Sequence, residues 1–235
     1  MMKRHLLLES ISAIVLLATS VIAQPPPIRI MPLGDSITYG SPVAGGYRLP
    51  LYITLTNANY NVDYVGSTTG NSDPGLGAEV NHEGHGGWRI SNPTAANGLY
   101  EYLYSWFEQI EDPHVVLVHI GTNDTNDPNF QNAINELDAL VTRIAACQPS
   151  AEIIVTTLMK RLAPNYTNIT NYFNPYVYPL VTNHVAQGHK VHFLDMHAKL
   201  ELADMGDNLH PNAVGHQKMA AAWFHAITNI IGTNA

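Results

Sequence analysis

Five short apolar runs, separated by segments of helical periodicity, constrain the fold more than any other feature of this chain. The runs read as buried strands and span residues 28–33, 62–65, 115–120, 153–158 and 191–194. The clearest helical segment is 130–147, where one face carries Phe130, Ile134, Leu137, Val141 and Ile144, and weaker helical segments cover 47–57, 99–110, 172–186 and 213–231. Buried strands that alternate with helices predict an α/β protein. We expect a three-layer α/β/α sandwich with a doubly wound, mostly parallel sheet of about five strands.

The first 23 residues have the pattern of a secretory signal peptide. A positively charged start at residues 3–5 precedes an apolar stretch at 11–21, and Val21-Ile22-Ala23 forms a small-residue cleavage site. The alternative, a membrane anchor, is disfavoured because Glu9 shortens the apolar stretch below the length of a bilayer span. We therefore expect residues 1–23 to be removed and residues 24–235 to form one domain, secreted, extracellular and without membrane contact.

The charge balance limits the classes of partner. The chain has 11 Lys and Arg against 19 Asp and Glu, a formal net charge of −8. Nucleic-acid binding needs clustered basic residues, so we expect no nucleic-acid partner and a neutral substrate. Cys147 is the sole cysteine in the sequence, so no intramolecular disulfide can form. We expect a monomer.

Four short segments, far apart in the sequence, carry the residue types of acyl-transfer chemistry. They are Gly34-Asp35-Ser36, Gly86-Gly87-Trp88, Gly121-Thr122-Asn123-Asp124 and Asp207-Asn208-Leu209-His210. Together they supply a serine nucleophile, a histidine base with a nearby carboxylate, and donors for an oxyanion. Each segment follows a predicted strand, and in open α/β sheets ligands bind beyond the carboxyl ends of the strands. The four segments are therefore expected at one edge of the sheet.

Taken in order, the segments resemble the blocks of the SGNH (GDSL-type) hydrolases, with the likeness running from Ile30 to about Gly215. A narrower resemblance, to the family 3 carbohydrate esterases, which include acetyl xylan esterases, rests on MPLGDSITYG at 31–40, GGYR at 45–48, VDYVGS at 62–67 and HEGHGGW at 82–88. The resemblance implies the flavodoxin-like strand order 2-1-3-4-5, which would bring Ser36 and Asn123 face to face. It also implies that residues 24–235 form an SGNH hydrolase catalytic domain.

Three residues are the candidates for the catalytic triad. Ser36 is proposed as the nucleophile, His210 as general base and then general acid, and Asp207 as the carboxylate that orients His210. The resemblance implies an oxyanion hole made of the backbone N–H groups of Ser36 and Gly87 and the side-chain amide of Asn123. Taken singly, each residue has a simpler interpretation, such as a helix cap for Ser36 or a turn glycine for Gly87.

Other residues of the blocks that carry the resemblance are candidates for further roles. Tyr39, Arg48 and Trp88 are candidates for substrate contacts, although aromatic side chains in such loops often only pack. His82 and His85 raise the alternative of a zinc site, but their spacing is not His-Glu-x-x-His and no motif places a third ligand. We therefore expect no metal and no other cofactor.

The sequence thus predicts a secreted serine esterase that removes acetyl groups from plant cell-wall polysaccharide, with acetylated xylan as the leading substrate and an acetyl-serine intermediate. Its expected partner is the acetylated polysaccharide or a small acetyl ester. Two alternatives stay open at this point: a general short-chain esterase or lipase of the same fold, and a non-catalytic carbohydrate-binding protein.

Overall fold

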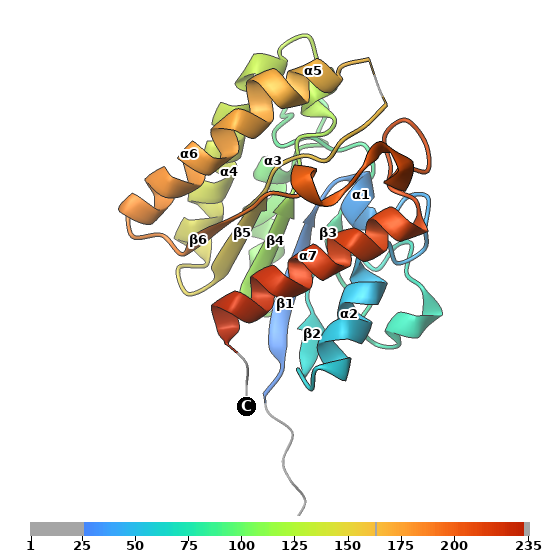
Figure 1. Cartoon of the computed structure of the whole chain (residues 1–235). Coiled ribbons are helices and arrows are strands. Elements are labelled where there is room, and N and C mark those ends of the chain that lie inside the picture. Colours follow the sequence, from blue (N-terminus) through green and yellow to red (C-terminus); the bar gives the residue numbers. More distant parts are fainter. Residues whose placement is uncertain (1–25, 163, 233–235) are drawn as a thin grey trace, which may run out of the picture.

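A parallel sheet forms the centre of the structure, a computed structural model that describes residues 26–162 and 164–232 (Figure 1). Its strands are β1 (Ile28–Gly34), β2 (Val62–Tyr64), β3 (Glu83–Gly84), β4 (Val115–His119), β5 (Glu152–Thr156) and β6 (Val191–Leu194). They lie in the order β2-β1-β4-β5-β6, and every paired neighbour is parallel. When β3 is left out and the five expected strands are numbered along the chain, the observed strand order is the predicted order 2-1-3-4-5. The predicted signal peptide, residues 1–23, lies outside the described residues.

One strand, β3, was not expected. Its two residues pair with the end of β1, at Leu33 and Gly34, beyond the part of β1 that pairs with β2. The described sheet therefore has six strands rather than about five. A strand of two residues with a charged side chain has no apolar run or alternation, so sequence periodicity cannot reveal it.

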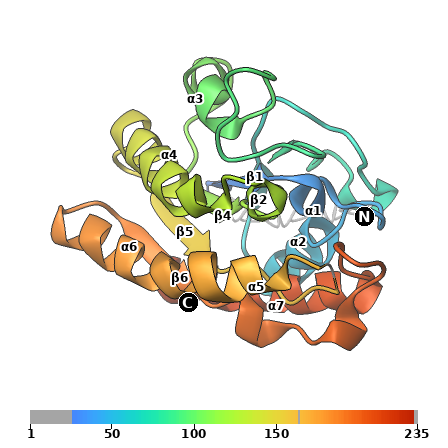
Figure 2. The same cartoon turned by 90° about the horizontal axis from the view of Figure 1, so that it is seen from above.

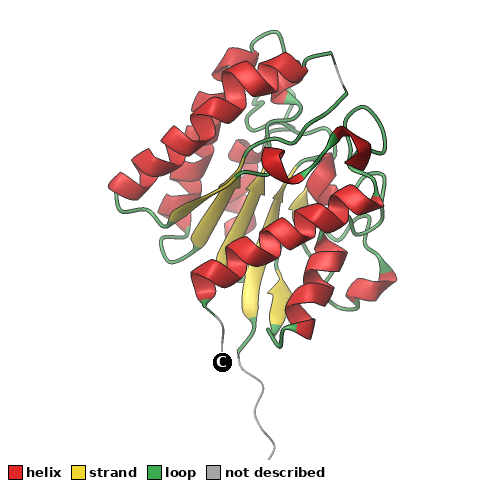
Figure 3. Ribbon diagram, viewed as in Figure 1, coloured by secondary structure: helices red, strands yellow, loops and turns green. Residues whose placement is uncertain are grey.

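Helices cover both faces of the sheet, which confirms the three-layer arrangement (Figures 2 and 3). One face packs against α3 (Leu99–Phe107), α4 (Ala133–Cys147) and α6 (Asn174–Ala186), and the other against α2 (Arg48–Asn57) and α7 (Ala213–Ile231). Successive residues of a strand point to opposite faces, so in β4 Val116 and Val118 enter the first layer and Val115 and Leu117 the second. Burial on both faces explains the continuous apolar runs.

Shorter elements occupy the connections. They are α1 (Ser36–Tyr39), α5 (Tyr166–Asn168), a π-helical turn at Ile169–Phe173, and 3-10 turns at Pro74–Leu76, Asp124–Asn126, Phe130–Asn132, His197–Lys199 and Leu202–Asp204. Two expected helices begin later than the sequence indicates. The segment 130–147 starts with a 3-10 turn, and α6 begins only at Asn174, followed by a proline that favours the first helical turn. No helix among the described residues combines the length and apolarity needed to cross a membrane.

Candidate active site

The four predicted segments meet at the carboxyl-terminal edge of the sheet, the edge that Figure 2 looks down upon. Ser36 lies at the start of α1, immediately after β1, and Asn123 follows β4, the neighbour of β1 across the point where strand order reverses. The turn between β1 and α1 is tight. A Cβ atom on Gly34 would lie 2.2 Å from the carbonyl oxygen of His119, so only glycine fits there.

Ser36 is held at the amino-terminal end of α1 by the residue before it. Asp35 caps the helix, and its Oδ1 accepts a hydrogen bond from the Ile37 N–H at 2.9 Å. The Ser36 N–H lies in the first helical turn, where backbone N–H groups have no acceptor within the helix. Ser36 is 9% exposed, so a small part of the residue is accessible to solvent.

Ser36, His210 and Asp207 form a continuous hydrogen-bonded chain. The Ser36 Oγ lies 2.9 Å from His210 Nε2, and His210 Nδ1 donates to Asp207 Oδ2 at 2.9 Å. The carboxylate can only accept, so it fixes the tautomer with the proton on Nδ1. Nε2 is then free to accept the hydroxyl proton of Ser36, which is the arrangement that a serine nucleophile and its general base require.

The carboxylate of Asp207 is itself fixed by backbone. Its Oδ1 accepts the N–H groups of Leu209 and His210, both at 2.7 Å, while Oδ2 faces the imidazole. Partial burial raises the pKa of Asp207, but the hydrogen bonds from His210 and Leu209 outweigh it and leave the pKa below its usual value. Asp207, whose side chain is 50% exposed, therefore stays ionised at neutral pH.

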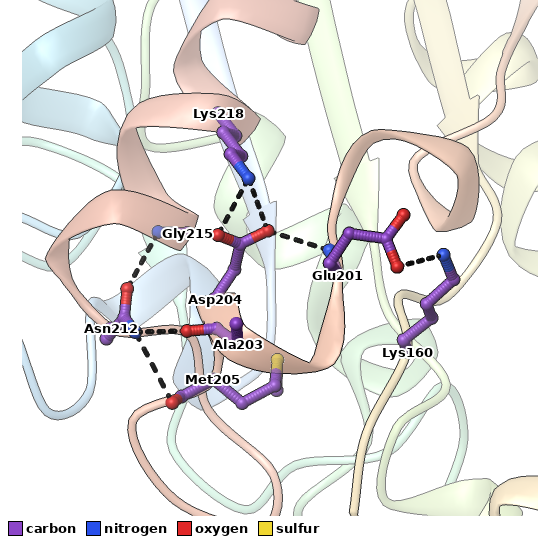
Figure 4. Close-up of polar contacts among 8 residues, drawn as sticks. All are labelled: Lys160, Glu201, Ala203, Asp204, Met205, Asn212, Gly215 and Lys218. Atoms are coloured by element: carbon purple, nitrogen blue, oxygen red, sulfur yellow. Dashed lines mark hydrogen bonds and ion pairs between the residues drawn. The ribbon is translucent and has the colours of Figure 1, made fainter.

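The loop that carries Asp207 and His210 is anchored at both ends (Figure 4). Before the loop, the Asp204 carboxylate pairs with Lys218 Nζ at 2.7 Å and accepts the Glu201 N–H at 2.7 Å. After the loop, the Asn212 side chain caps α7 through the Gly215 N–H and donates to the carbonyls of Ala203 and Met205. These contacts tie the triad loop to α7.

Hydrogen bonds join the segments that carry the three expected oxyanion donors to one short loop. The His85 N–H donates to the Gly34 carbonyl at 2.9 Å, next to Ser36, and the Asn123 side-chain amide donates to the Trp88 carbonyl at 2.7 Å. Between them, Gly87 has φ +77° in a turn closed by a hydrogen bond from the Trp88 N–H to the His85 carbonyl, the geometry of a type II turn. The second N–H of the Asn123 amide is left for another acceptor.

Glu83 and His85 support this loop, and sequence reasoning assigned them no such role. The Glu83 side chain is completely buried, and its carboxylate pairs with His85 Nε2 at 2.7 Å and accepts the Ser67 N–H. The His85 ring stacks on the rings of both Trp88 and Trp106, with centroids 4.3 Å and 4.8 Å away, and the two tryptophan rings lie 5.9 Å from each other. The only signal in the sequence was the HEGH segment itself, which the zinc alternative had drawn attention to.

Asp35 and Asp124 brace their loops. Asp35 is completely buried, and burial raises its pKa to about 6 although the Ile37 N–H opposes this. Asp124 accepts the Ile90 N–H at 3.1 Å, and burial raises its pKa to about 7. Asp124 thereby fixes the segment after Asn123 to the segment after Trp88.

The residues expected to contact substrate differ in their placement. Arg48 is completely buried, and its guanidinium donates to backbone carbonyls at Thr38, Tyr39, Gly70, Asn71 and Val80. The expectation of a substrate contact is therefore wrong for Arg48, because it binds loops inside the protein.

Tyr39 and Trp88 remain partly exposed. The Tyr39 ring packs edge-on to His82, with centroids 6.0 Å apart, and the Trp88 ring stacks on His85. Each therefore has a packing role, and their contact with substrate stays a prediction.

His82 and His85 are engaged in hydrogen bonds. His82 is buried, its Nδ1 accepts the Gly84 N–H, and its Nε2 donates to the Gly70 carbonyl, so both ring nitrogens are used. Burial lowers the pKa of His82 to about 3 and keeps the ring neutral. Among the described residues, no group of three or more His, Cys, Asp or Glu side chains has the arrangement of a metal site. The hydrogen bonds give His82 a structural role.

Comparison with known proteins agrees with this geometry. The family model described as "GDSL-like Lipase/Acylhydrolase family" matches residues 33–218. The chain belongs to this family. The family description names lipases and acylhydrolases, enzymes that hydrolyse carboxylic esters. Its fold is that of the SGNH hydrolases of the carbohydrate esterase type.

Two solved structures and one curated sequence show the range of relatives. A family 3 carbohydrate esterase of Clostridium thermocellum is 29% identical, with a TM-score of 0.75, over 88% of this chain and 98% of that one. A family 3 carbohydrate esterase of Talaromyces cellulolyticus shares the fold at 23% identity, with a TM-score of 0.70, over 87% of this chain and 98% of that one. A multidomain esterase of Ruminococcus flavefaciens is 29% identical over 85% of this chain, which spans only 28% of that protein.

Proposed function

We propose that this acylhydrolase is a serine esterase that removes acetyl groups from plant cell-wall polysaccharide, with acetylated xylan as its substrate. The observation that carries the proposal is the hydrogen-bonded chain from Ser36 through His210 to Asp207. The similarity to carbohydrate esterases supports a sugar ester over other acyl esters. The formal charge of −8 fits a neutral polymer better than an anionic one.

In the first half of the proposed reaction, Ser36 Oγ attacks the carbonyl carbon of the acetyl ester while His210 Nε2 takes the hydroxyl proton. The charge that develops on the carbonyl oxygen is stabilised by the N–H groups of Ser36 and Gly87 and by the amide of Asn123. The imidazolium, stabilised by Asp207, then protonates the sugar oxygen as the carbon–oxygen bond breaks. The products are the free sugar hydroxyl and acetyl-Ser36.

In the second half, a water molecule attacks the acetyl carbonyl and gives its proton to His210 Nε2. The same oxyanion donors stabilise the second tetrahedral intermediate. His210 returns the proton to Ser36 Oγ as the acyl bond breaks, and acetic acid leaves and ionises to acetate by releasing a proton to the solvent. Atoms and charge balance without a metal or an organic cofactor, and we propose that none is needed.

The protein is also proposed to act outside the cell. We propose that the signal peptide is cleaved after Ala23 and that the protein acts as an extracellular monomer on insoluble polysaccharide. The amino-terminal sequence of protein recovered from the culture medium tests this. A chain beginning at Gln24 is expected, and a chain retained in the cells with residues 1–23 attached would contradict it.

Acetate release from acetylated xylan, compared with acetylated pectin, acetylated chitin and 4-nitrophenyl butyrate, tests the substrate. We expect the highest kcat/KM on acetylated xylan and none above background in the Ser36→Ala variant. A preference for the butyryl ester would instead assign the protein as a general short-chain esterase. Absence of acetate release from every ester would favour a non-catalytic carbohydrate-binding protein.

A further inference from the structure

A polar cavity lies beside the candidate active site, and no step of the proposed reaction uses it. It has a volume of about 350 Å³ and opens between the segment after Trp88 and the segment after Asn123. This volume is within the usual range of small-molecule sites, ~300–1,000 Å³, but such sites are mostly lined by apolar groups. Most residues lining this cavity are polar, so the ligand that fits it must be rich in hydrogen-bonding groups.

The walls of the cavity are continuous with the oxyanion loops. Arg89 directly follows Trp88, and Asp124 directly follows Asn123, and both line the cavity. The Asn123 amide and the Trp88 carbonyl are themselves joined by a hydrogen bond of 2.7 Å. Adjacent Cα atoms are ~3.8 Å apart, so the cavity begins within one residue of the groups that would bind the ester carbonyl. A polymer whose acetyl ester is attacked by Ser36 would have its neighbouring units within reach of the cavity.

The cavity is held open by contacts within its walls. The Arg89 guanidinium pairs with the Asp127 carboxylate, which also accepts the Asn129 N–H at 2.8 Å. The Ile90 N–H donates to Asp124 and joins the two sides. A ligand would therefore meet a site that is already formed, which reduces the entropy lost on binding.

Side-chain amides supply the free hydrogen-bonding groups. Asn129 and Asn132 line the cavity, both are exposed, and neither side chain has a hydrogen-bond partner among residues 26–162 and 164–232. Phe130 lies between them in sequence and adds an apolar ring, which packs edge-on to Tyr172 with centroids 5.1 Å apart. Amides for hydroxyl groups and an aromatic ring for an apolar C–H face are the two features by which proteins recognise a pyranose ring.

The charges of the cavity favour a neutral ligand over an ion. The positive charge of Arg89 is neutralised by Asp127. Burial raises the pKa of Asp124 to about 7, so this carboxyl is partly protonated at neutral pH, and burial also raises the pKa of Glu136. We propose that this cavity binds a glycosyl unit of the polysaccharide adjacent to the sugar whose acetyl ester is cleaved at Ser36.

This subsite rests on the proposed function, and a ratio of activities tests it. The Asn129→Ala/Asn132→Ala double variant is compared with wild type on acetylated xylohexaose and on xylose tetraacetate, a single sugar that has no neighbouring unit. Loss of two hydrogen bonds to neutral groups is expected to lower the hexaose-to-monosaccharide ratio of kcat/KM about tenfold. The matched control, Asn183→Ala on the exposed face of α6, should leave the ratio unchanged. An unchanged ratio in the double variant overturns the subsite.

A binding measurement separates failure of the subsite from failure of the function. Unacetylated xylohexaose is titrated into the Ser36→Ala variant by calorimetry, with and without the two asparagine substitutions. Binding that weakens about tenfold in the triple variant supports the subsite, whatever the wild type does with acetyl esters. Equal affinity for both proteins overturns it, whereas a wild type that releases no acetate from any sugar ester overturns the proposed function.

Discussion

Replacing Asp207 with asparagine should inactivate the enzyme by imposing the wrong tautomer on His210. The Asp207 Oδ1 accepts two backbone N–H groups, from Leu209 and His210, so the oxygen of an asparagine amide is held in that position. The amide NH₂ must then face His210 Nδ1, which becomes an acceptor, and the ring proton moves to Nε2. Nε2 can no longer accept the proton of Ser36.

The size of the effect follows from those two hydrogen bonds. Rotating the amide to restore the active tautomer would lose both, at ~0.5–1.5 kcal/mol each, and would point NH₂ at two N–H groups. A penalty of about 2 kcal/mol leaves only a few per cent of molecules in the active tautomer. Loss of the charge that stabilises the imidazolium adds to this, but less than in a buried triad, because the Asp207 side chain is 50% exposed. We expect kcat/KM for 4-nitrophenyl acetate to fall about 10²–10⁴-fold.

An alanine variant provides the decisive comparison. Asp207→Ala removes the carboxylate but lets water contact Nδ1, so either tautomer can form, and its activity should equal or exceed that of Asp207→Asn. Nitrogen NMR of the His210 ring should report protonated Nδ1 in the wild type and protonated Nε2 in the asparagine variant. An asparagine variant within threefold of wild type, with Nδ1 still protonated, would refute the reasoning.

Three further predictions concern stability. Glu83→Ala should lower the free energy of unfolding by about 1–3 kcal/mol in urea titrations, because it leaves His85 Nε2 and the Ser67 N–H without their hydrogen-bond partner; unchanged stability would contradict the account of this pair. Arg48→Lys should lower the melting temperature, since an ammonium group cannot reach all the carbonyls that the guanidinium binds, and a calorimetric scan in which the variant melts with wild type would argue against that role. Burial lowers the pKa of His216 from 6.5 to about 4, so the unfolded state binds a proton more readily than the folded state does. The free energy of unfolding therefore falls as the pH decreases from 6.5 towards 4. The stability of wild type minus that of His216→Leu should therefore drop by about 3 kcal/mol between pH 7 and pH 4, and a difference independent of pH would exclude a neutral buried His216.

The sheet and the triad geometry were accessible from the sequence because each has a local signal. Strands buried on both faces must be apolar throughout, so the runs at 28–33 and 115–120 stand out. Once those strands are parallel, the residues that follow them share one edge, and this places Ser36 and Asn123 at the same edge of the sheet without any knowledge of the loops. The strand order itself came from the family resemblance.

The supporting contacts around the site could not be predicted from the sequence in the same way. Arg48 and Glu83 are charged, and charged side chains are rarely buried, so the sequence favours the surface for both. Their burial depends on partners that lie far away in the sequence, such as the carbonyls of Gly70 and Val80 for Arg48. No periodicity encodes such contacts.

Covalent labelling of Ser36 tests the central claim most directly. The protein is titrated with diethyl 4-nitrophenyl phosphate, the modified residue is identified by peptide mass mapping, and acetate release from acetylated xylan is measured on the same samples. We predict a single diethylphosphoryl group on Ser36, with activity lost in proportion to the fraction labelled. A label on another residue, or full activity in protein whose Ser36 is completely labelled, would contradict the assignment of Ser36 as the nucleophile.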